Sequence, residues 1–162
     1  MAFTCRKQLL CLMLCASMMA LTLANKDWQF GFNSWNHRPT VSKKLVVGDL
    51  QSWRYGSNYT DWAIKTSPFF LNDTLVFKFD APSDTNPFQH SVYLLRSFWH
   101  FLACDFRGAK MVANVTQGGG EGFEFRMNRW MPYYFACGEH DGAHCRDGQM
   151  KFIAMPLPQY RY

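Results

Sequence analysis

The chain has 162 residues, of which 17 are basic and 12 are acidic, and aromatic side chains make up 17% of it. This length fits one domain, and the apolar content is ample for a core. The excess of positive charge is small, and Lys and Arg form no cluster along the chain. We therefore expect no binding to nucleic acid, which is recognised through concentrated basic patches.

The first 24 residues have the composition of a secretory signal peptide. Arg6 and Lys7 precede an almost wholly apolar run, Leu9–Leu23, which ends in small residues that suit a cleavage site. The run is too short and too poorly flanked for a transmembrane helix. We predict that residues 1–24 are removed and that the protein is secreted to the extracellular space or cell wall. Residues 155–162 contain no apolar tail, so we expect no glycosylphosphatidylinositol anchor.

Removal of the signal leaves an odd number of cysteines, namely Cys104, Cys137 and Cys145. Cysteines tend to pair in an oxidising compartment, so one sulfur is expected to lack an intramolecular partner. Three N-glycosylation sequons follow the signal, and we expect them on surface loops. They begin at Asn58, Asn72 and Asn114.

Short runs suited to β-strands dominate the chain from residue 44 onward. Several alternate apolar with polar residues, as a strand covering one side of a core does, and turn residues separate them. The expected strands are Lys44–Val47, Thr74–Phe79, Ser91–Leu95, Met111–Val115, Gly122–Arg126, Pro132–Ala136 and Met150–Ala154. Helical turns are expected within Tyr59–Ser67 and Arg96–Gly108.

This pattern of short strands with frequent turns indicates an all-β fold, an antiparallel sandwich or barrel. Since no linker divides the chain, we predict one domain over residues 44–156. An N-terminal extension at 25–43 precedes it, and a short tail at 157–162 follows. Large aromatic side chains, Trp99 and Trp130 among them, are expected mostly in the core.

The segment from Cys137 to Gln149 concentrates side chains that bind metals. It holds two thiols, two imidazoles and an amide, at Cys137, His140, His144, Cys145 and Gln149. Two disulfides are compatible with the sequence: Cys137–Cys145 across this loop, or Cys104–Cys145 between distant segments. The second is attractive because the strand before Cys137 would deliver that thiol into the interior, but sequence alone leaves the connectivity open.

A free thiolate beside imidazoles is the chemistry of a type 1 copper site. Such a site uses two imidazoles, one thiolate and a weak axial ligand from Met, Gln or a backbone oxygen. Cys137, His144 and Gln149 lie on one loop, and His90 opens an earlier strand. Met150 follows Gln149, and alternation along a strand points its side chain the other way.

These motifs resemble the phytocyanins, the secreted plant cupredoxins that include stellacyanins, uclacyanins, plantacyanins and early nodulin-like proteins. The resemblance covers about residues 45–155. Its motifs, specific when taken together and in this order, are Val46–Trp53, Tyr59–Trp62, Asn72–Phe79, His90–Val92, Cys104, Tyr133–Gly138 and His144–Gln149. It implies a cupredoxin-like Greek-key β-sandwich of about seven or eight strands.

The resemblance also implies roles for individual residues. Cys104 and Cys145 match the family disulfide. One mononuclear copper ion is then the cofactor, and the function is one-electron transfer in a monomer, with an unidentified redox partner or cell-wall component and without enzymatic turnover. A low reduction potential is expected, because an amide oxygen favours Cu(II) more than a thioether does. The implied copper ligands are His90, Cys137, His144 and, as the axial amide of the stellacyanin type, Gln149.

The loop between Cys137 and His144 departs from the family pattern. It has six residues where the family usually has four. His140 offers a tighter spacing from Cys137 and is the competing ligand. We favour His144, because the position five beyond His140 is Cys145, a poor axial ligand when it is disulfide-bonded.

Three other functions are compatible with these residues. A fold does not imply its metal, so the main alternative is a copper-free extracellular module that binds cell-wall glycans or surface proteins. Zinc is a second, although adjacent His144 and Cys145 would strain one tetrahedron. A Cys–His hydrolase is a third, and it would need an orienting group and an oxyanion hole.

Overall fold

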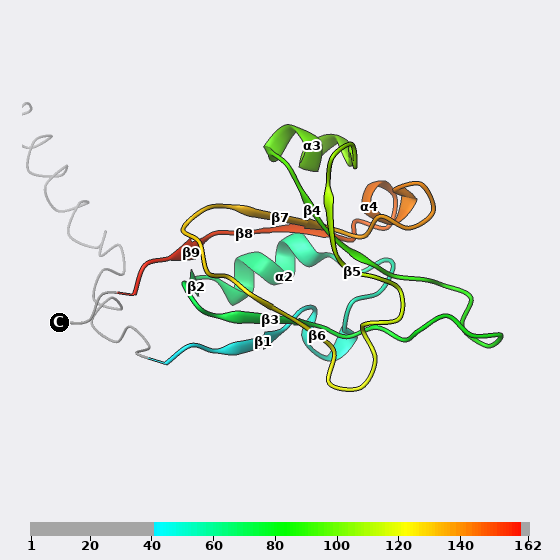
Figure 1. Cartoon of the computed structure of the whole chain (residues 1–162), viewed down its shortest axis with the longest axis horizontal. Coiled ribbons are helices and arrows are strands. Elements are labelled where there is room, and N and C mark those ends of the chain that lie inside the picture. Colours follow the sequence, from blue (N-terminus) through cyan, green and yellow to red (C-terminus); the bar gives the residue numbers. More distant parts are fainter. Residues whose placement is uncertain (1–40, 160–162) are drawn as a thin grey trace, which may run out of the picture. The chain divides into compact units, whose positions relative to one another are not determined.

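The structure, a computed structural model, describes residues 41–159, all within one compact unit (Figure 1). The expected signal peptide, residues 25–40 of the expected extension and the last three residues of the expected tail lie outside the described residues. Within 41–159, no helix is both long and apolar enough to cross a membrane. The first strand begins at Lys44, and the last pairs through Leu157.

The described residues form two larger sheets and one short strand pair. The three-stranded sheet has the order β1(Lys44–Val46), β3(Thr74–Phe77), β6(Phe123–Arg126). The four-stranded sheet has the order β5(Lys110–Ala113), β4(Val92–Leu95), β7(Tyr133–Ala136), β8(Lys151–Ala154), and all its pairs are antiparallel. The pair β2(Phe69–Phe70) and β9(Pro156–Leu157) is parallel. This is the expected all-β cupredoxin-like sandwich, and all seven expected strands are confirmed within a few residues.

Aromatic rings fill the space between the two larger sheets. The rings of Phe77 on β3 and Phe135 on β7 lie 5.3 Å apart, centroid to centroid. The ring of Phe152 on β8 stacks on Phe135 at 5.1 Å, and Trp53 meets Phe77 edge-on at 5.3 Å. All four side chains are fully buried. Inward residues two apart along β7 and β8 therefore build the core that alternation predicted.

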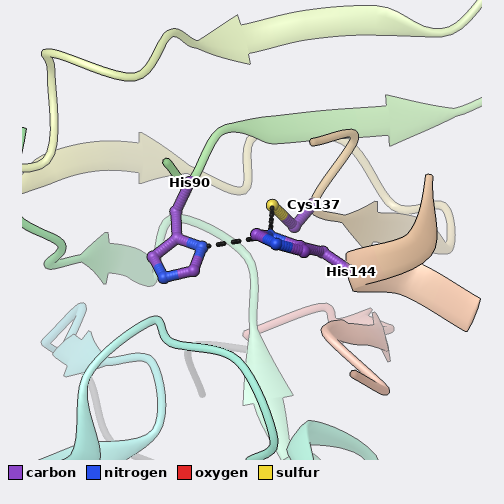
Figure 2. A group of neighbouring side chains, drawn as sticks. All are labelled: His90, Cys137 and His144. Carbon is purple, nitrogen blue, oxygen red and sulfur yellow. Dashed lines mark hydrogen bonds between the residues drawn. The ribbon is translucent and has the colours of Figure 1, made fainter. Parts of the chain in front are cut away.

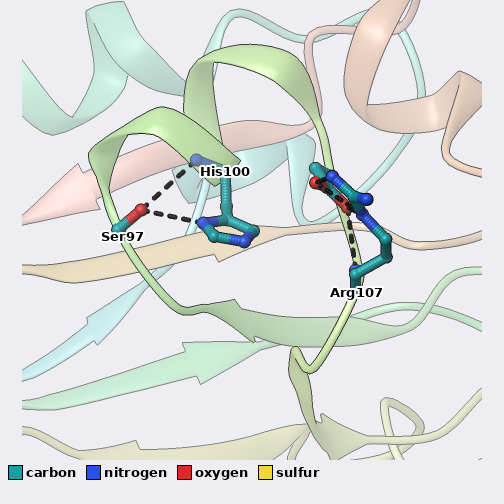
Figure 3. Close-up of polar contacts among 4 residues, drawn as sticks. Ser97, His100 and Arg107 are labelled. Atoms are coloured by element: carbon teal, nitrogen blue, oxygen red, sulfur yellow. Dashed lines mark hydrogen bonds and ion pairs between the residues drawn. The ribbon is translucent and has the colours of Figure 1, made fainter.

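The two expected helical segments are confirmed and capped by their own sequences. Helix α2(Tyr59–Thr66) packs against β8, and the Asn58 side chain accepts the hydrogen bond of the Asp61 amide at its start. Helix α3(Phe98–Ala103) is preceded by Ser97, whose hydroxyl caps the His100 amide and lies 2.8 Å from His100 Nδ1 (Figure 3). This Ser–His pair thus serves helix capping.

Two shorter helical elements were not expected, and two of the large aromatic side chains lie outside the core. The extra elements are the 3-10 turn η2(Asp49–Gln51) and the one-turn helix α4(Ala143–Arg146). Trp99 is 75% exposed on α3 and Trp130 is 66% exposed in the β6–β7 connection. Residue type alone does not place a side chain when it sits on a short element at the rim of the sandwich.

We predict that replacing Asp73 destabilises the fold. This fully buried carboxylate accepts hydrogen bonds from the backbone amides of Lys43, at 2.8 Å, and Phe70, at 2.9 Å. Asp73→Ala leaves both amides without a partner and should cost about 3 kcal/mol in the free energy of unfolding. Urea denaturation measures this cost, with Asp84→Ala as the exposed control, expected within about 0.5 kcal/mol of the parent. Equal stabilities of the two variants would contradict the assignment.

Candidate metal centre

Neighbouring strands bring the first two candidate ligands together. His90 lies just before β4 and Cys137 just after β7, and these strands pair antiparallel, with Tyr93 opposite Ala136. The end of β7 therefore lies beside the start of β4, at the same end of the sheet. Ser91 sits at this meeting point, and its backbone amide donates to Cys137 Sγ at 3.5 Å.

Two further hydrogen bonds hold Ser91 in place. Its carbonyl accepts the Trp53 indole N–H at 3.0 Å, and its hydroxyl accepts the Gly138 amide at 3.4 Å. Its side chain is fully buried. The backbone next to His90 is thus tied both to the aromatic core and to the strand that carries Cys137.

The third candidate ligand, His144, completes a compact buried group (Figure 2). His144 Nδ1 lies 3.3 Å from His90 Nδ1 and 3.5 Å from Cys137 Sγ. The ligand atoms of the three residues all lie within 4.8 Å of one another. His90 is 7% exposed, His144 3% and Cys137 0%. Two imidazole nitrogens and one sulfur converge on a point shielded from water.

Burial sets the protonation of all three groups. It lowers the pKa of His90 to about 4, with a further contribution from His144 and His140, and it also lowers the pKa of His144. Both imidazoles are therefore neutral near pH 7, and each ring has one nitrogen that carries a lone pair. Burial raises the pKa of the Cys137 thiol, so a metal that binds there must displace a proton.

The six-residue loop closes by folding into a turn and a short helix. The Gly142 amide donates to Gly138 and Glu139 carbonyls, both at 3.2 Å, and α4 begins directly afterwards. Gly142 adopts a left-handed backbone (φ 80°), which costs a glycine little. The two additional residues are absorbed in this turn, so the longer loop still delivers His144 to Cys137.

A disulfide joins Cys104 at the end of α3 to Cys145 in α4. Of the two pairings compatible with the sequence, this is the one that the phytocyanin resemblance implied. It fixes α4 one residue away from His144 and leaves Cys137 as a free, buried thiol. A zinc tetrahedron that includes Cys145 is thereby excluded, because a disulfide sulfur is no thiolate ligand.

His140, the competing candidate, lies outside the buried group. Its side chain is exposed, and its ring rests on the outer side of His144 with the centroids 4.8 Å apart. The ring of Tyr55 meets His144 edge-on at 5.2 Å. Neither residue is among the three that converge, so the position favoured from sequence, His144, is the one that faces Cys137.

The structure disagrees with the expected inward position of Gln149. Its side chain is exposed, and its backbone is left-handed (φ 52°) between α4 and β8. Met150 is fully buried instead, and the Cys137 amide donates to the Met150 carbonyl at 2.9 Å. Because Ala136 pairs with Lys151 in antiparallel strands, the next position along β7, Cys137, lies opposite Met150. The two side chains therefore share a face of the sheet. The sequence does contain a signal for the inward position of Met150: it lies two residues before Phe152, so alternation along the strand puts both on the same face. Spacing from His144 pointed to Gln149 instead.

The donor set fits a soft transition-metal ion. Two neutral imidazoles and a thiolate-forming cysteine are ligands that copper and zinc accept, and hard cations such as Mg²⁺ do not prefer them. His90 lies next to β4, Cys137 directly follows β7 and His144 lies in α4, so regular elements position all three side chains.

Comparison with solved structures identifies the class of protein. Cucumber stellacyanin with Cu²⁺ shares 25% identity and has a TM-score of 0.58, covering 74% of this chain and 98% of its own. Cucumber basic protein, a blue copper protein, shares 24% identity with a TM-score of 0.53, covering 70% of this chain and 99% of its own. No family model matches the chain, and no curated protein matches it in sequence.

The sandwich and its buried His–Cys–His group define a cupredoxin-like domain. Within this class the chain is phytocyanin-like, as its motifs predicted.

All three sequon asparagines are exposed, which is compatible with glycosylation. The Asn58 Oδ1 caps α2, and the Asn114 Oδ1 accepts the Thr116 amide at 3.0 Å. Asn72 lies in a turn with a left-handed backbone. Attachment of glycans to them stays a prediction.

We predict that His144, and not His140, is needed for metal binding. One equivalent of Co(II) should raise the melting temperature of the parent by roughly 5–10 °C, because only the folded state offers the three converging donors. The His144→Ala variant should lose this shift, whereas His140→Ala should retain it. Calorimetry with and without the ion gives the comparison, and a retained shift in His144→Ala would contradict the site.

Proposed function

We propose that this protein is a one-electron carrier with a mononuclear type 1 copper ion held by His90, Cys137 and His144. The observation that carries the proposal is the convergence of these donors, within 4.8 Å, in a buried group at the end of a cupredoxin-like sandwich. The fold is similar to those of a stellacyanin with Cu²⁺ and of a blue copper protein, which supports the choice of copper over zinc. Copper bound there would supply reversible exchange between Cu(II) and Cu(I).

The chain contributes rigidity and exclusion of water. Ser91, next to His90, hydrogen-bonds the Cys137 sulfur and the Gly138 amide, and α4 is fixed by the Cys104–Cys145 disulfide. A site that changes little between two oxidation states needs little reorganisation on electron exchange. The Ser91 amide donates to Cys137 Sγ, which stabilises negative charge on the sulfur. Exchange of single electrons transforms no substrate, so we propose that the protein is not an enzyme.

Met150 is the proposed weak axial donor, in place of Gln149. Its burial and its position opposite Cys137 support this choice, while the exposure of Gln149 argues against the amide. A thioether favours Cu(I) more than an amide oxygen does. The reduction potential is therefore expected to be higher than the Gln149 hypothesis implied.

Secretion and the partner are proposed on other grounds. The Cys104–Cys145 disulfide fits an oxidising compartment, and the N-terminal sequence favours export to the extracellular space or cell wall. The electron donor or acceptor is then an extracellular redox partner or a cell-wall component. We propose that the protein acts as a monomer.

The first prediction from this proposal is colour. Purified protein with its disulfide intact should turn blue with one equivalent of Cu(II), because a short copper–thiolate bond gives an intense visible absorption. Cys137→Ser should bind copper more weakly and stay pale. A colourless parent protein would contradict the proposal and favour the copper-free binding module, which retention on a glycan array would then test.

The second prediction concerns the axial donor. Met150→Gln should lower the reduction potential, because the amide oxygen stabilises Cu(II), and should alter the visible spectrum. Gln149→Met should leave both unchanged. Protein-film voltammetry measures the potentials; a rise in Gln149→Met with no change in Met150→Gln would restore Gln149 as the axial ligand.

A further inference from the structure

We propose that electrons enter and leave this site through His140 and Tyr55, the two side chains that cover His144. The inference rests on the proposed copper function and adds to it the place where a redox partner makes contact. Neither residue belongs to the converging group of His90, Cys137 and His144.

The metal-binding side chains offer a partner almost no surface. His144 is 3% exposed, His90 is 7% exposed and Cys137 is not exposed at all. Electron tunnelling falls steeply with distance, so a partner must touch the residues that lie directly over the ligands. The relevant surface consists of exposed side chains in contact with a ligand ring.

His140 and Tyr55 meet this requirement on the His144 side. His140 is exposed, and its ring lies 4.8 Å from the His144 ring at an interplanar angle of 35°. Tyr55 is 49% exposed and meets the same ring at 5.2 Å. The two aromatic rings thus link His144 directly to solvent-exposed surface.

Local structure holds both covering rings in place. The His140 carbonyl accepts the Ala143 amide at 2.9 Å, which fixes the turn before α4. Tyr55 packs on Gly148, where an added Cβ would lie 2.5 Å from the ring, and the Gly56 amide donates to the Gly148 carbonyl at 3.2 Å.

Among residues 41–159, no exposed aromatic ring packs against His90. Besides that of His144, the ring beside His90 is that of Phe79, at 6.5 Å, and Phe79 is only 6% exposed. A partner on that side would stand one buried ring further from the ligands. The contact surface is therefore assigned to the loop that carries His140 and to the Tyr55 turn.

Charge substitution at His140 tests the contact. We would compare His140→Lys with His140→Glu in oxidation of the Cu(I) protein by hexacyanoferrate(III), followed by the blue absorption in a stopped-flow instrument. One electron leaves the Cu(I) protein and reduces hexacyanoferrate(III) to hexacyanoferrate(II); no bond forms or breaks. The Lys variant should react at least about tenfold faster than the Glu variant at low ionic strength, because the oxidant is a trianion, and salt should shrink the ratio.

Trp99 provides the matched control. It is 75% exposed on α3 and makes no ring contact with the ligands among the described residues. Trp99→Lys and Trp99→Glu should differ by less than about twofold, the effect of a screened distant charge. Equal ratios at the two positions would overturn the assignment. The reduction potential of each variant is measured alongside, so that a change in driving force is not mistaken for a change in contact.

A second readout uses the metal-free protein. If His140 and Tyr55 cover the site, His140→Ala and Tyr55→Ala should speed the reaction of Cys137 with a thiol reagent severalfold, and Trp99→Ala should not. Unchanged labelling in both cover variants would overturn the assignment. A colourless parent protein contradicts the proposed function itself, whereas a blue protein whose rate ignores the charge at position 140 overturns this inference alone.

Discussion

The metal centre depends on the hydrogen bonds of one residue, Ser91. Its amide, carbonyl and hydroxyl bind Cys137 Sγ, the Trp53 indole and the Gly138 amide in turn. A fully buried residue with these partners cannot shift without leaving polar groups unsatisfied. His90 therefore has its backbone position set by the aromatic core on one side and by β7 on the other, although 46 residues separate Ser91 from Cys137.

The loop that carries His144 is attached to the rest of the fold by a disulfide. His144 sits on α4, a helix too short to be stable alone, in a loop with three consecutive left-handed residues, His140, Asp141 and Gly142. The disulfide from Cys145 to Cys104 anchors that loop to α3. The six-residue loop therefore still brings His144 to 3.5 Å from the Cys137 sulfur.

Much of the architecture was predictable because it obeys local rules. Alternation located the seven longer strands, and α2 and α3 start at Asn58 and Ser97, residues that cap helices. The β2–β9 pair and α4 could not be predicted, because two to four residues carry no periodic signal. Gln149 shows how two local rules conflict: spacing from His144 favoured it, while the pleat of β8 turned Met150 inward. Ser91 and Tyr55 had no signal in sequence, since their roles arise only from tertiary contacts.

The complete burial of Cys137 has a consequence for the resistance of this thiol to disulfide exchange. Thiol–disulfide exchange requires a thiolate to reach another sulfur, and this sulfur has no exposed surface and a raised pKa. Covalent dimers through Cys137 therefore require the fold to open first. The folded sheet thus protects the free Cys137 thiol, and the risk of such dimers is confined to states in which β7 has not joined the sheet.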